Sequence, residues 1–126
     1  MIRPLLNVAS AIVVVMLFAR NTGCRDKQNS DKEVIKKLYE EYSFGQIEAC
    51  TFNNQKVYHA GINAFDAGSK VYDEKGNTIA TCNFATRMVD EACEKLEDCE
   101  TIYRCENHIS GNPPVDKYNL TKNENR

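Results

Sequence analysis

The pattern of apolar and polar positions divides the chain into a short apolar start and a longer mixed segment. The run Leu5–Ala19 is mostly apolar, and Arg3 precedes it with a positive charge. A membrane-spanning helix needs about 20 apolar residues, which is more than this run provides. A positive start followed by a short apolar segment is typical of a secretory signal peptide, so we predict that residues 1–23 direct export.

The mixed segment opens with a helical periodicity, in which apolar side chains recur three and four positions apart. This apolar stripe consists of Val34, Ile35, Leu38, Tyr39 and Tyr42. Ser30 followed by Glu33 matches a capping box, so the pattern predicts a helix from Ser30 to about residue 42. We expect the stripe to face the core, and the polar residues 24–29 to form a tether before the helix.

The pattern then changes to a period of two, which indicates strands. Three strands are predicted, at Lys56–Ala60, Lys70–Asp73 and Thr78–Phe84. The segment Gly61–Gly68 between the first two is rich in Gly, Asn and Asp and is predicted as a loop. Gly76 can adopt the positive φ of a tight reversal, so the last two strands should form a hairpin. Alternation on the returning strand places Ala80, Cys82 and Phe84 on the core face.

The last third of the chain is predicted as a helix, a strand and a polar tail. Apolar spacing favours a short second helix at Val89–Asp98 with an acidic outer face, and Cys99–Cys105 is rich in β-favouring residues. Residues 107–126 are polar and contain two consecutive prolines, so we expect them to lie on the surface or fray. The order of elements predicts a small α+β domain at residues 30–106, with two short helices on an antiparallel sheet of three or four strands.

Six cysteines are present in this short chain, and a small exported domain with this density is usually held by disulfides. They are Cys24, Cys50, Cys82, Cys93, Cys99 and Cys105. We favour the pairs Cys82–Cys93 and Cys50–Cys99 and leave Cys105 as a free thiol, although four cysteines allow three connectivities. A Cys99–Cys105 pair is disfavoured, because it needs a tight reversal within a predicted strand. A zinc site is not indicated, because no two cysteines have the Cys-x-x-Cys spacing.

The residues that follow the apolar run are Asn21-Thr22-Gly23-Cys24. This segment resembles the lipobox of bacterial lipoproteins. The resemblance implies cleavage after Gly23 and attachment of lipid, such as palmitate, to Cys24. It therefore implies a protein of the bacterial cell envelope that is bound to the membrane through its N-terminal lipid. Two alternatives stay open: a simple secreted protein with Cys24 in a disulfide, and an uncleaved anchor.

The membrane in which such a lipoprotein resides is also open. Residue 25 is Arg, not the Asp that marks inner-membrane retention in enteric bacteria. This difference slightly favours the outer membrane, with the domain facing either the periplasm or the surface.

Charge excludes some partners. The two basic residues before Cys24 are Arg3 and Arg20, so the chain from Cys24 onward has 14 Lys and Arg against 18 Asp and Glu, a formal charge of −4. Nucleic acid binding requires a positive surface, so nucleic acid is not expected as a partner. Purely electrostatic binding to anionic lipid is disfavoured for the same reason.

No catalytic, cofactor-binding or metal-binding pattern is visible in the sequence. His59 is predicted within a strand and His108 within a loop, and neither has neighbouring residues that suggest a triad or a metal site. A nucleophilic Cys105 beside His108 is disfavoured, because Glu106 would oppose formation of the thiolate. Acidic residues on the second helix are expected to be solvated, and no EF-hand, phosphate or nucleotide motif is present.

These observations favour a non-catalytic binding or structural module of the cell envelope with an unknown protein or envelope ligand. The alternative is an inhibitor of a protease or lysozyme, in which Gly61–Gly68 would enter the cleft of the enzyme. An enzyme remains the third hypothesis, because fold and composition do not exclude a site that no motif reveals.

Overall fold

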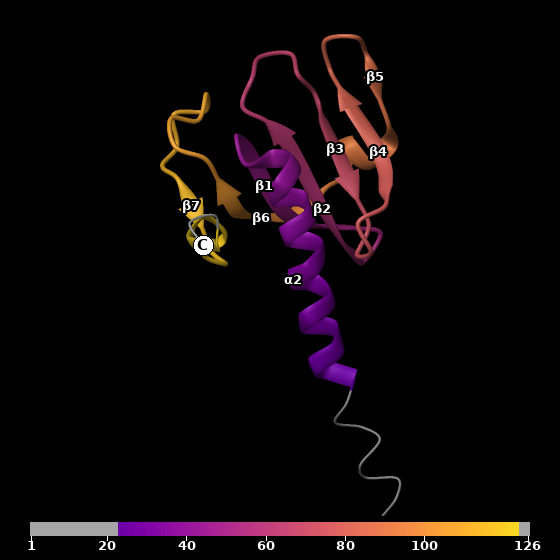
Figure 1. Cartoon of the computed structure of the whole chain (residues 1–126). Helices are drawn as coiled ribbons and strands as arrows, with labels where there is room; N and C mark the ends of the chain where they lie inside the picture. Colours follow the sequence, from indigo (N-terminus) through magenta and orange to yellow (C-terminus); the bar gives the residue numbers. More distant parts are fainter. Residues whose placement is uncertain (1–22, 124–126) are drawn as a thin grey trace, which may run out of the picture.

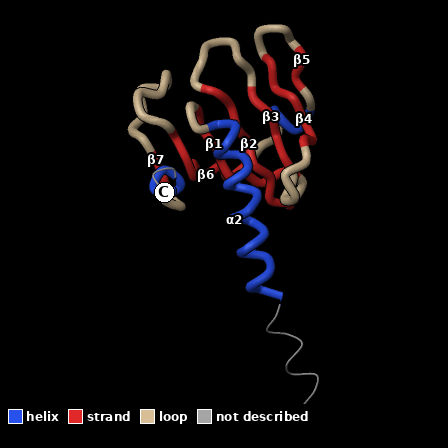
Figure 2. Tube along the Cα trace, in the orientation of Figure 1, coloured by secondary structure: helices blue, strands red, loops and turns tan. Residues whose placement is uncertain are grey.

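A computed structural model describes residues 23–123 of the chain, and the greater part of the predicted signal peptide lies outside this range. The described residues form one antiparallel sheet with a long helix packed across one face, as Figures 1 and 2 show. Within this range no helix is both long enough and apolar enough to cross a membrane.

The sheet has the strand order β5-β4-β3-β2-β1-β6-β7, and every neighbouring pair is antiparallel. The strands are β1 (Gly45–Phe52), β2 (Gln55–Ile62), β3 (Ser69–Tyr72), β4 (Thr78–Asn83), β5 (Met88–Val89), β6 (Glu97–Arg104) and β7 (Val115–Asp116). The helices are α2 (Gly23–Tyr42), α3 (Glu91–Glu94) and the 3-10 helix η1 (Leu120–Asn123). The α+β class is confirmed, whereas the predicted three or four strands and two short helices are wrong for the described part of the chain.

The predicted start of the first helix at Ser30 is wrong. Helix α2 begins at Gly23, and Ser30 lies in its interior. Residues 24–29 contain no Pro or Gly and include Arg, Lys and Gln, which favour helix, so the helix continues backward through the predicted tether. The residues 27–30 are exposed, and this part of α2 extends beyond the sheet in Figure 1.

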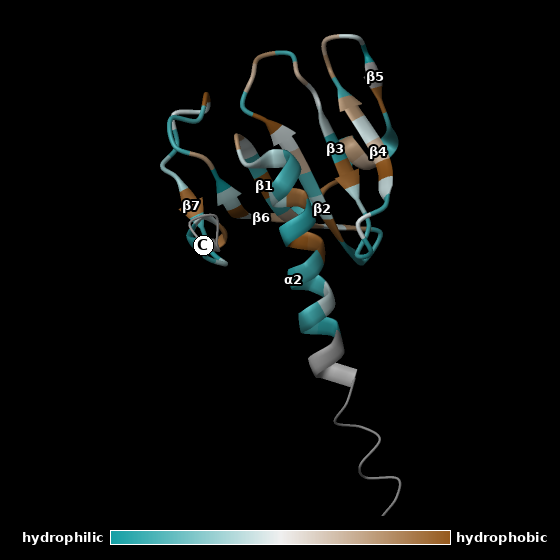
Figure 3. Ribbon diagram, viewed as in Figure 1, coloured by the Kyte–Doolittle hydropathy of each residue, from teal (hydrophilic) through white to brown (hydrophobic). Residues whose placement is uncertain are grey.

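The apolar stripe of α2 packs on the sheet, as predicted. All five of its side chains are buried, and they join Ile47, Tyr58 and Tyr72 in one cluster. The ring centroids of Tyr39 and Tyr103 lie 4.9 Å apart in an edge-to-face arrangement. The other face of α2 is hydrophilic in Figure 3 and points to solvent.

Strand β1 was missed because its apolar residues are divided between the two faces of the sheet. Ile47 and Ala49 join the cluster under α2, whereas Cys50 and Phe52 join a second cluster on the opposite face with Val71. The alternation of apolar and polar residues that identifies a half-exposed strand holds from Gln46 to Ala49 and then breaks, because the apolar Cys50 and Phe52 lie on the face opposite that of Ile47 and Ala49. The remaining polar residues of β1 then make the segment resemble a loop.

The hairpin of β3 and β4 forms as predicted, with Gly76 at a φ of +86° in its turn. The carboxylate of Asp73 stabilises the turn by accepting hydrogen bonds from the backbone N–H groups of Lys75 and Asn77, each at 2.9 Å. Of the predicted core face, Ala80 and Cys82 are buried, but Phe84 is 67% exposed. Strand β4 ends at residue 83, so Phe84 lies in the following turn rather than in the core.

The predicted second helix at Val89–Asp98 is largely wrong. Val89 pairs with Cys82 in β5, and the helix is limited to the four residues of α3. Cross-strand pairing and the disulfide of Cys93 fix this segment against β4, so the chain makes one helical turn and enters β6 at Glu97.

The predicted polar tail contributes to the domain. Strand β7 pairs with the outer edge of β6, and Leu120 is only 4% exposed within the cluster under α2. The carboxylate of Asp116 accepts hydrogen bonds from the backbone N–H groups of Leu120 and Thr121, which holds η1 against the last strand.

Both favoured disulfides are present, Cys50–Cys99 and Cys82–Cys93, with sequence separations of 49 and 11 residues. In the described part of the chain, Cys105 is the free cysteine, and it is buried. Both bridges lie on the face of the sheet opposite α2, where Cys50 and Cys82 belong to the second cluster.

Removal of each disulfide should reduce stability, and the loss should grow with the logarithm of the length of the loop that the bridge closes. We expect Cys82→Ala/Cys93→Ala to lower the free energy of unfolding by about 3 kcal/mol and Cys50→Ala/Cys99→Ala by about 4 kcal/mol. Urea unfolding monitored by circular dichroism, with Cys105→Ala as the single-thiol control, provides the measurement. Equal stability of wild type and both double variants would contradict the assigned bridges.

Candidate functional site

One end of the sheet carries most of the exposed large apolar side chains of the described chain. We call this region the loop end, and it comprises the α2–β1, β2–β3, β4–β5 and β6–β7 connections. Its exposed apolar residues are Phe44, Ile62, Phe65, Phe84 and Ile109. Phe44 and Phe65 are 79% and 82% exposed. Figure 1 shows these connections at the end of the sheet away from the N-terminal part of α2.

Hydrogen bonds of Asn63 fix three of these connections relative to one another. Its backbone N–H donates to the carbonyl of Phe44 at 2.7 Å, and its side-chain amide nitrogen donates to the carbonyl of Asn107 at 3.3 Å. Its side-chain oxygen accepts from the backbone N–H of Ile109 at 2.7 Å. The predicted loop Gly61–Gly68 is therefore attached to both neighbouring connections.

A polar cluster lies beside the loop end, on the sheet face opposite α2. Glu48 of β1 pairs directly with His59 of β2. Ser69 of β3 pairs with Gly61, two positions after His59. His59 Nδ1 lies 3.3 Å from Glu48 Oε2, and His59 Nε2 lies 2.7 Å from Ser69 Oγ. One imidazole therefore joins a carboxylate on one strand to a hydroxyl on another.

Two further side chains hold Glu48 in place. Arg104 Nε donates to Gln46 Oε1 at 2.7 Å, and Gln46 Nε2 donates to Glu48 Oε1 at 2.6 Å. The hydrogen bond from His59 is the main reason that the pKa of Glu48 lies below its ordinary value of 4.5. Burial opposes this shift, and the Gln46 amide and the Arg104 charge contribute to it. Glu48 is therefore ionised near neutral pH.

A shallow hollow of about 190 Å³ adjoins the cluster. His59, Ser69 and His108 contribute polar groups to its lining, and Ile62 and Ile109 contribute apolar walls. The hollow thus combines the imidazole–hydroxyl pair with part of the loop end.

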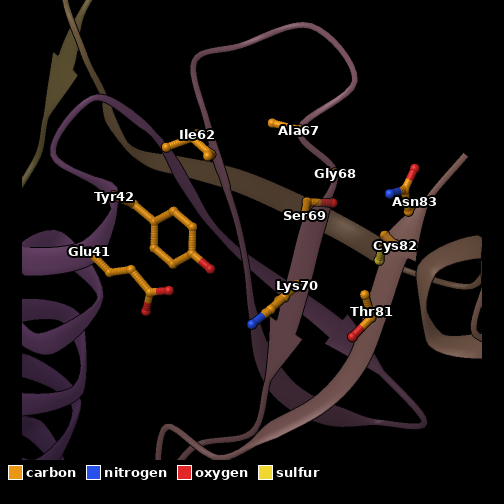
Figure 4. A pocket seen from close by; sticks show the side chains of 10 residues that line it. All are labelled: Glu41, Tyr42, Ile62, Ala67, Gly68, Ser69, Lys70, Thr81, Cys82 and Asn83. Atoms are coloured by element: carbon orange, nitrogen blue, oxygen red, sulfur yellow. The ribbon is translucent and has the colours of Figure 1, made fainter. Parts of the chain in front are cut away.

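A second hollow, of about 270 Å³, lies on the α2 side of the sheet, and Figure 4 shows its lining. Glu41 and Tyr42 line it from α2, and Lys70 and Thr81 line it from β3 and β4. The hydroxyl of Tyr42 is hydrogen-bonded to that of Tyr72 at 2.5 Å, and burial is the main cause of a raised pKa of Tyr42. Tyr42 therefore stays neutral at physiological pH, and its side chain packs in the core.

The structure separates the other chemically interesting residues. His108 makes its side-chain contacts with Ser110, through Nδ1, and the thiol of Cys105 is buried. Among the described residues, one group of three possible metal ligands lies close together, formed by Glu48, Cys50 and Cys99. The two cysteines are joined in a disulfide, so they cannot act as thiolate ligands.

Sequence reasoning missed the polar cluster because its members are 10 and 11 residues apart and meet only through strand pairing. A correct assignment of β1, with Glu48 opposite His59, would have revealed it. The sequence predicted a loop at Gly61–Gly68; in the structure the loop is residues 63–68, because Gly61 and Ile62 belong to β2.

A scan against protein-family models and searches of curated proteins and of solved structures found no match to this chain.

The hydrogen bonds of ionised Glu48 should make stability depend on pH. A pKa held below 4.5 means that this contribution is complete above about pH 4.5 and is lost as the pH falls below that value. We expect Glu48→Gln to lower the free energy of unfolding by about 1 kcal/mol at pH 7, and the difference from wild type to shrink at pH 3. Urea titrations at both pH values test this, with exposed Glu74→Gln as the control; a pH-independent difference would contradict it.

Proposed function

We propose that the protein is an exported lipoprotein of the cell envelope that binds a partner protein through the loop end. The leader and the lipobox-like segment before Cys24 support export and lipid attachment. Two disulfides in so small a domain support folding in an oxidising compartment. Two or more acyl chains on Cys24 would hold the protein firmly, because each buried CH₂ contributes about 0.8 kcal/mol.

The geometry of α2 supports a binding site that faces away from the membrane. The helix is continuous from Gly23, and Val34 is the first buried residue among those from 27 onward, whose burial the structure describes. At about 1.5 Å per residue, the ten residues from Cys24 to Val34 give roughly 15 Å of helix between the lipid attachment point and the first of these buried side chains. The loop end lies at the opposite end of the sheet, so a domain held in this way presents it outward.

The observation that carries the binding proposal is the concentration of exposed apolar side chains at the loop end. Single exposed apolar residues are common on protein surfaces, but a group of them that includes aromatic rings marks an interaction site. Three phenylalanines and two isoleucines are exposed there, and Asn63 fixes three of the connections that carry them. A fixed surface reduces the entropy lost on binding.

The shape of the loop end favours an enzyme cleft as the partner surface. The β2–β3 loop and the β4–β5 turn project beyond the strands in Figure 1 and carry Phe65 and Phe84 at exposed positions. Projecting apolar residues complement a concave site, and ligand-binding sites of enzymes are concave and mostly apolar. Inhibition of an extracellular or envelope hydrolase, such as a protease or lysozyme, is therefore the specific form of binding that we propose to test.

Lipid attachment predicts a labelled mature protein. Cells that express the full chain should incorporate labelled palmitate into it, and globomycin should cause the unprocessed form to accumulate, because the signal peptidase for lipoproteins cleaves before the modified cysteine. Cys24→Ala should take up no label and Cys105→Ala should label as wild type does. A mature wild-type protein without label would overturn the lipoprotein proposal.

Binding through the loop end predicts inhibition that depends on its phenylalanines. We expect the full-length protein in mild detergent to inhibit at least one protease or lysozyme of a panel at micromolar concentration, and Phe65→Ser to weaken this inhibition about tenfold or more. Ile79→Ser is the matched control, because Ile79 is a 45% exposed apolar residue at the other end of β4. Absence of inhibition across the panel, or equal effects of both variants, would refute the inhibitor proposal.

A further inference from the structure

In the polar cluster of Glu48, His59 and Ser69, a carboxylate contacts an imidazole and the imidazole contacts a hydroxyl, which is the arrangement that activates a hydroxyl group as a nucleophile. All three side chains project from neighbouring strands on the face opposite α2. The sequence neighbours of Glu48 and His59, which are Ile47, Tyr58 and Ala60, belong to the cluster under that helix, and Ser69 pairs with Cys82 of the second cluster. Both imidazole nitrogens are engaged, one by a carboxylate and the other by a hydroxyl. A nucleophile, a base and a group that orients the base are the parts that a covalent mechanism needs.

The charge of Glu48 determines which imidazole nitrogen carries the proton. An ionised carboxylate only accepts hydrogen bonds, so His59 Nδ1 must be the donor in the 3.3 Å contact. In neutral His59 the other nitrogen, Nε2, then has a free lone pair, and the 2.7 Å contact is a hydrogen bond donated by Ser69 Oγ. The hydroxyl proton therefore already points at the group that would remove it.

We propose that Ser69 is a nucleophile that accepts an acyl group from a small ester, with His59 as its general base and Glu48 as a positioning residue. The adjoining hollow of about 190 Å³ contains both Ser69 and His59, so a substrate can reach the hydroxyl. Its walls at Ile62 and Ile109 are apolar and fit a short acyl chain. This activity goes beyond the binding role and does not depend on it.

The reaction follows from these positions. Ser69 Oγ attacks the ester carbonyl carbon while His59 Nε2 takes the hydroxyl proton. The bond from the carbonyl carbon to the leaving oxygen then breaks, and His59 Nε2 returns the proton to the departing alcohol. Water attacks the acyl-serine with the same base, the carboxylic acid leaves, and Ser69 regains its proton. Glu48 remains ionised and stabilises the transient imidazolium, as a carboxylate does in other hydroxyl–imidazole systems.

The same distances also suit a purely structural arrangement of cross-strand polar pairs, which contribute about 0.2–1 kcal/mol each. The two interpretations differ in reactivity. A structural arrangement leaves Ser69 as unreactive as any other serine, whereas general-base assistance accelerates acyl transfer by about 10²–10⁴-fold.

The test is acylation of the full-length protein, in mild detergent, by 4-nitrophenyl acetate. We expect one acetyl group per chain by intact mass, located on Ser69 by peptide mapping, and release of nitrophenolate at least tenfold faster than from Ser69→Ala. Ser69→Ala retains both histidines, so it measures the background reaction of imidazole. Ser110→Ala is the matched control, because the described structure gives Ser110 a histidine contact, at 2.8 Å, but gives that histidine no carboxylate.

Three further variants separate the proposed role from a folding defect. Glu48→Gln should lower the acetylation rate and Glu48→Asp should restore part of it, since only the second keeps a carboxylate for His59. Ser69→Cys should form the acetyl adduct at the same position. Equal rates in wild type and Ser69→Ala, or adducts only on lysines and other serines, would overturn the proposal. Loss of hydrolase inhibition in Phe65→Ser would leave this result unaffected.

Discussion

The packing of the apolar stripe of α2 on the sheet is the interaction on which the remaining structure depends. Ile35, Ile47 and Tyr58 are almost completely buried where the helix meets the central strands. Full burial of a side chain of this size contributes about 1.5–3 kcal/mol before the conformational entropy lost on folding is subtracted, which is large beside the net stability of a small domain, about 5–15 kcal/mol. The hydrogen bond between the hydroxyls of Tyr42 and Tyr72 satisfies two polar groups that this packing removes from water.

The opposite face of the sheet has no long helix in the described structure. Two disulfides stabilise this face, where less apolar surface is buried. The second cluster combines Val57, Val71 and Ala80 with the half-cystines of both bridges. One bridge ties β1 to β6, and the other ties β4 to the segment after β5. The bridges close loops with sequence separations of 49 and 11 residues, so both lower the entropy of the unfolded state, the longer loop more than the shorter one. The remaining part of this face is free to carry polar side chains, and Glu48, His59 and Ser69 occupy it.

The sequence predicted the parts of the fold that depend on near neighbours in the chain. The stripe from Val34 to Tyr42 and the turn at Gly76 follow from local periodicity and glycine geometry. The favoured cysteine pairs are one of three possible connectivities, and the structure contains them. The central strand β1 and the reduced second helix do not, because burial on two faces and pairing of Val89 with Cys82 override local preference. The polar cluster could not be predicted for a related reason. Its residues form no motif in the sequence, and they come together only because Glu48 lies opposite His59 in the sheet.

Strand register connects the core to the proposed chemistry. A slip of β1 by one residue would turn Ile47 toward solvent and Glu48 into the cluster under α2, so the burial that stabilises the domain also fixes the carboxylate against His59. The close approach of Gly45 to β2 supports this register, because a Cβ atom there would lie 2.0 Å from the carbonyl oxygen of Gly61. A hydroxyl–imidazole–carboxylate arrangement on rigid strands needs no ordering when a substrate arrives, whereas the same residues on loops would lose entropy on alignment. The constraint that positions Ser69 for reaction is therefore the packing of the core.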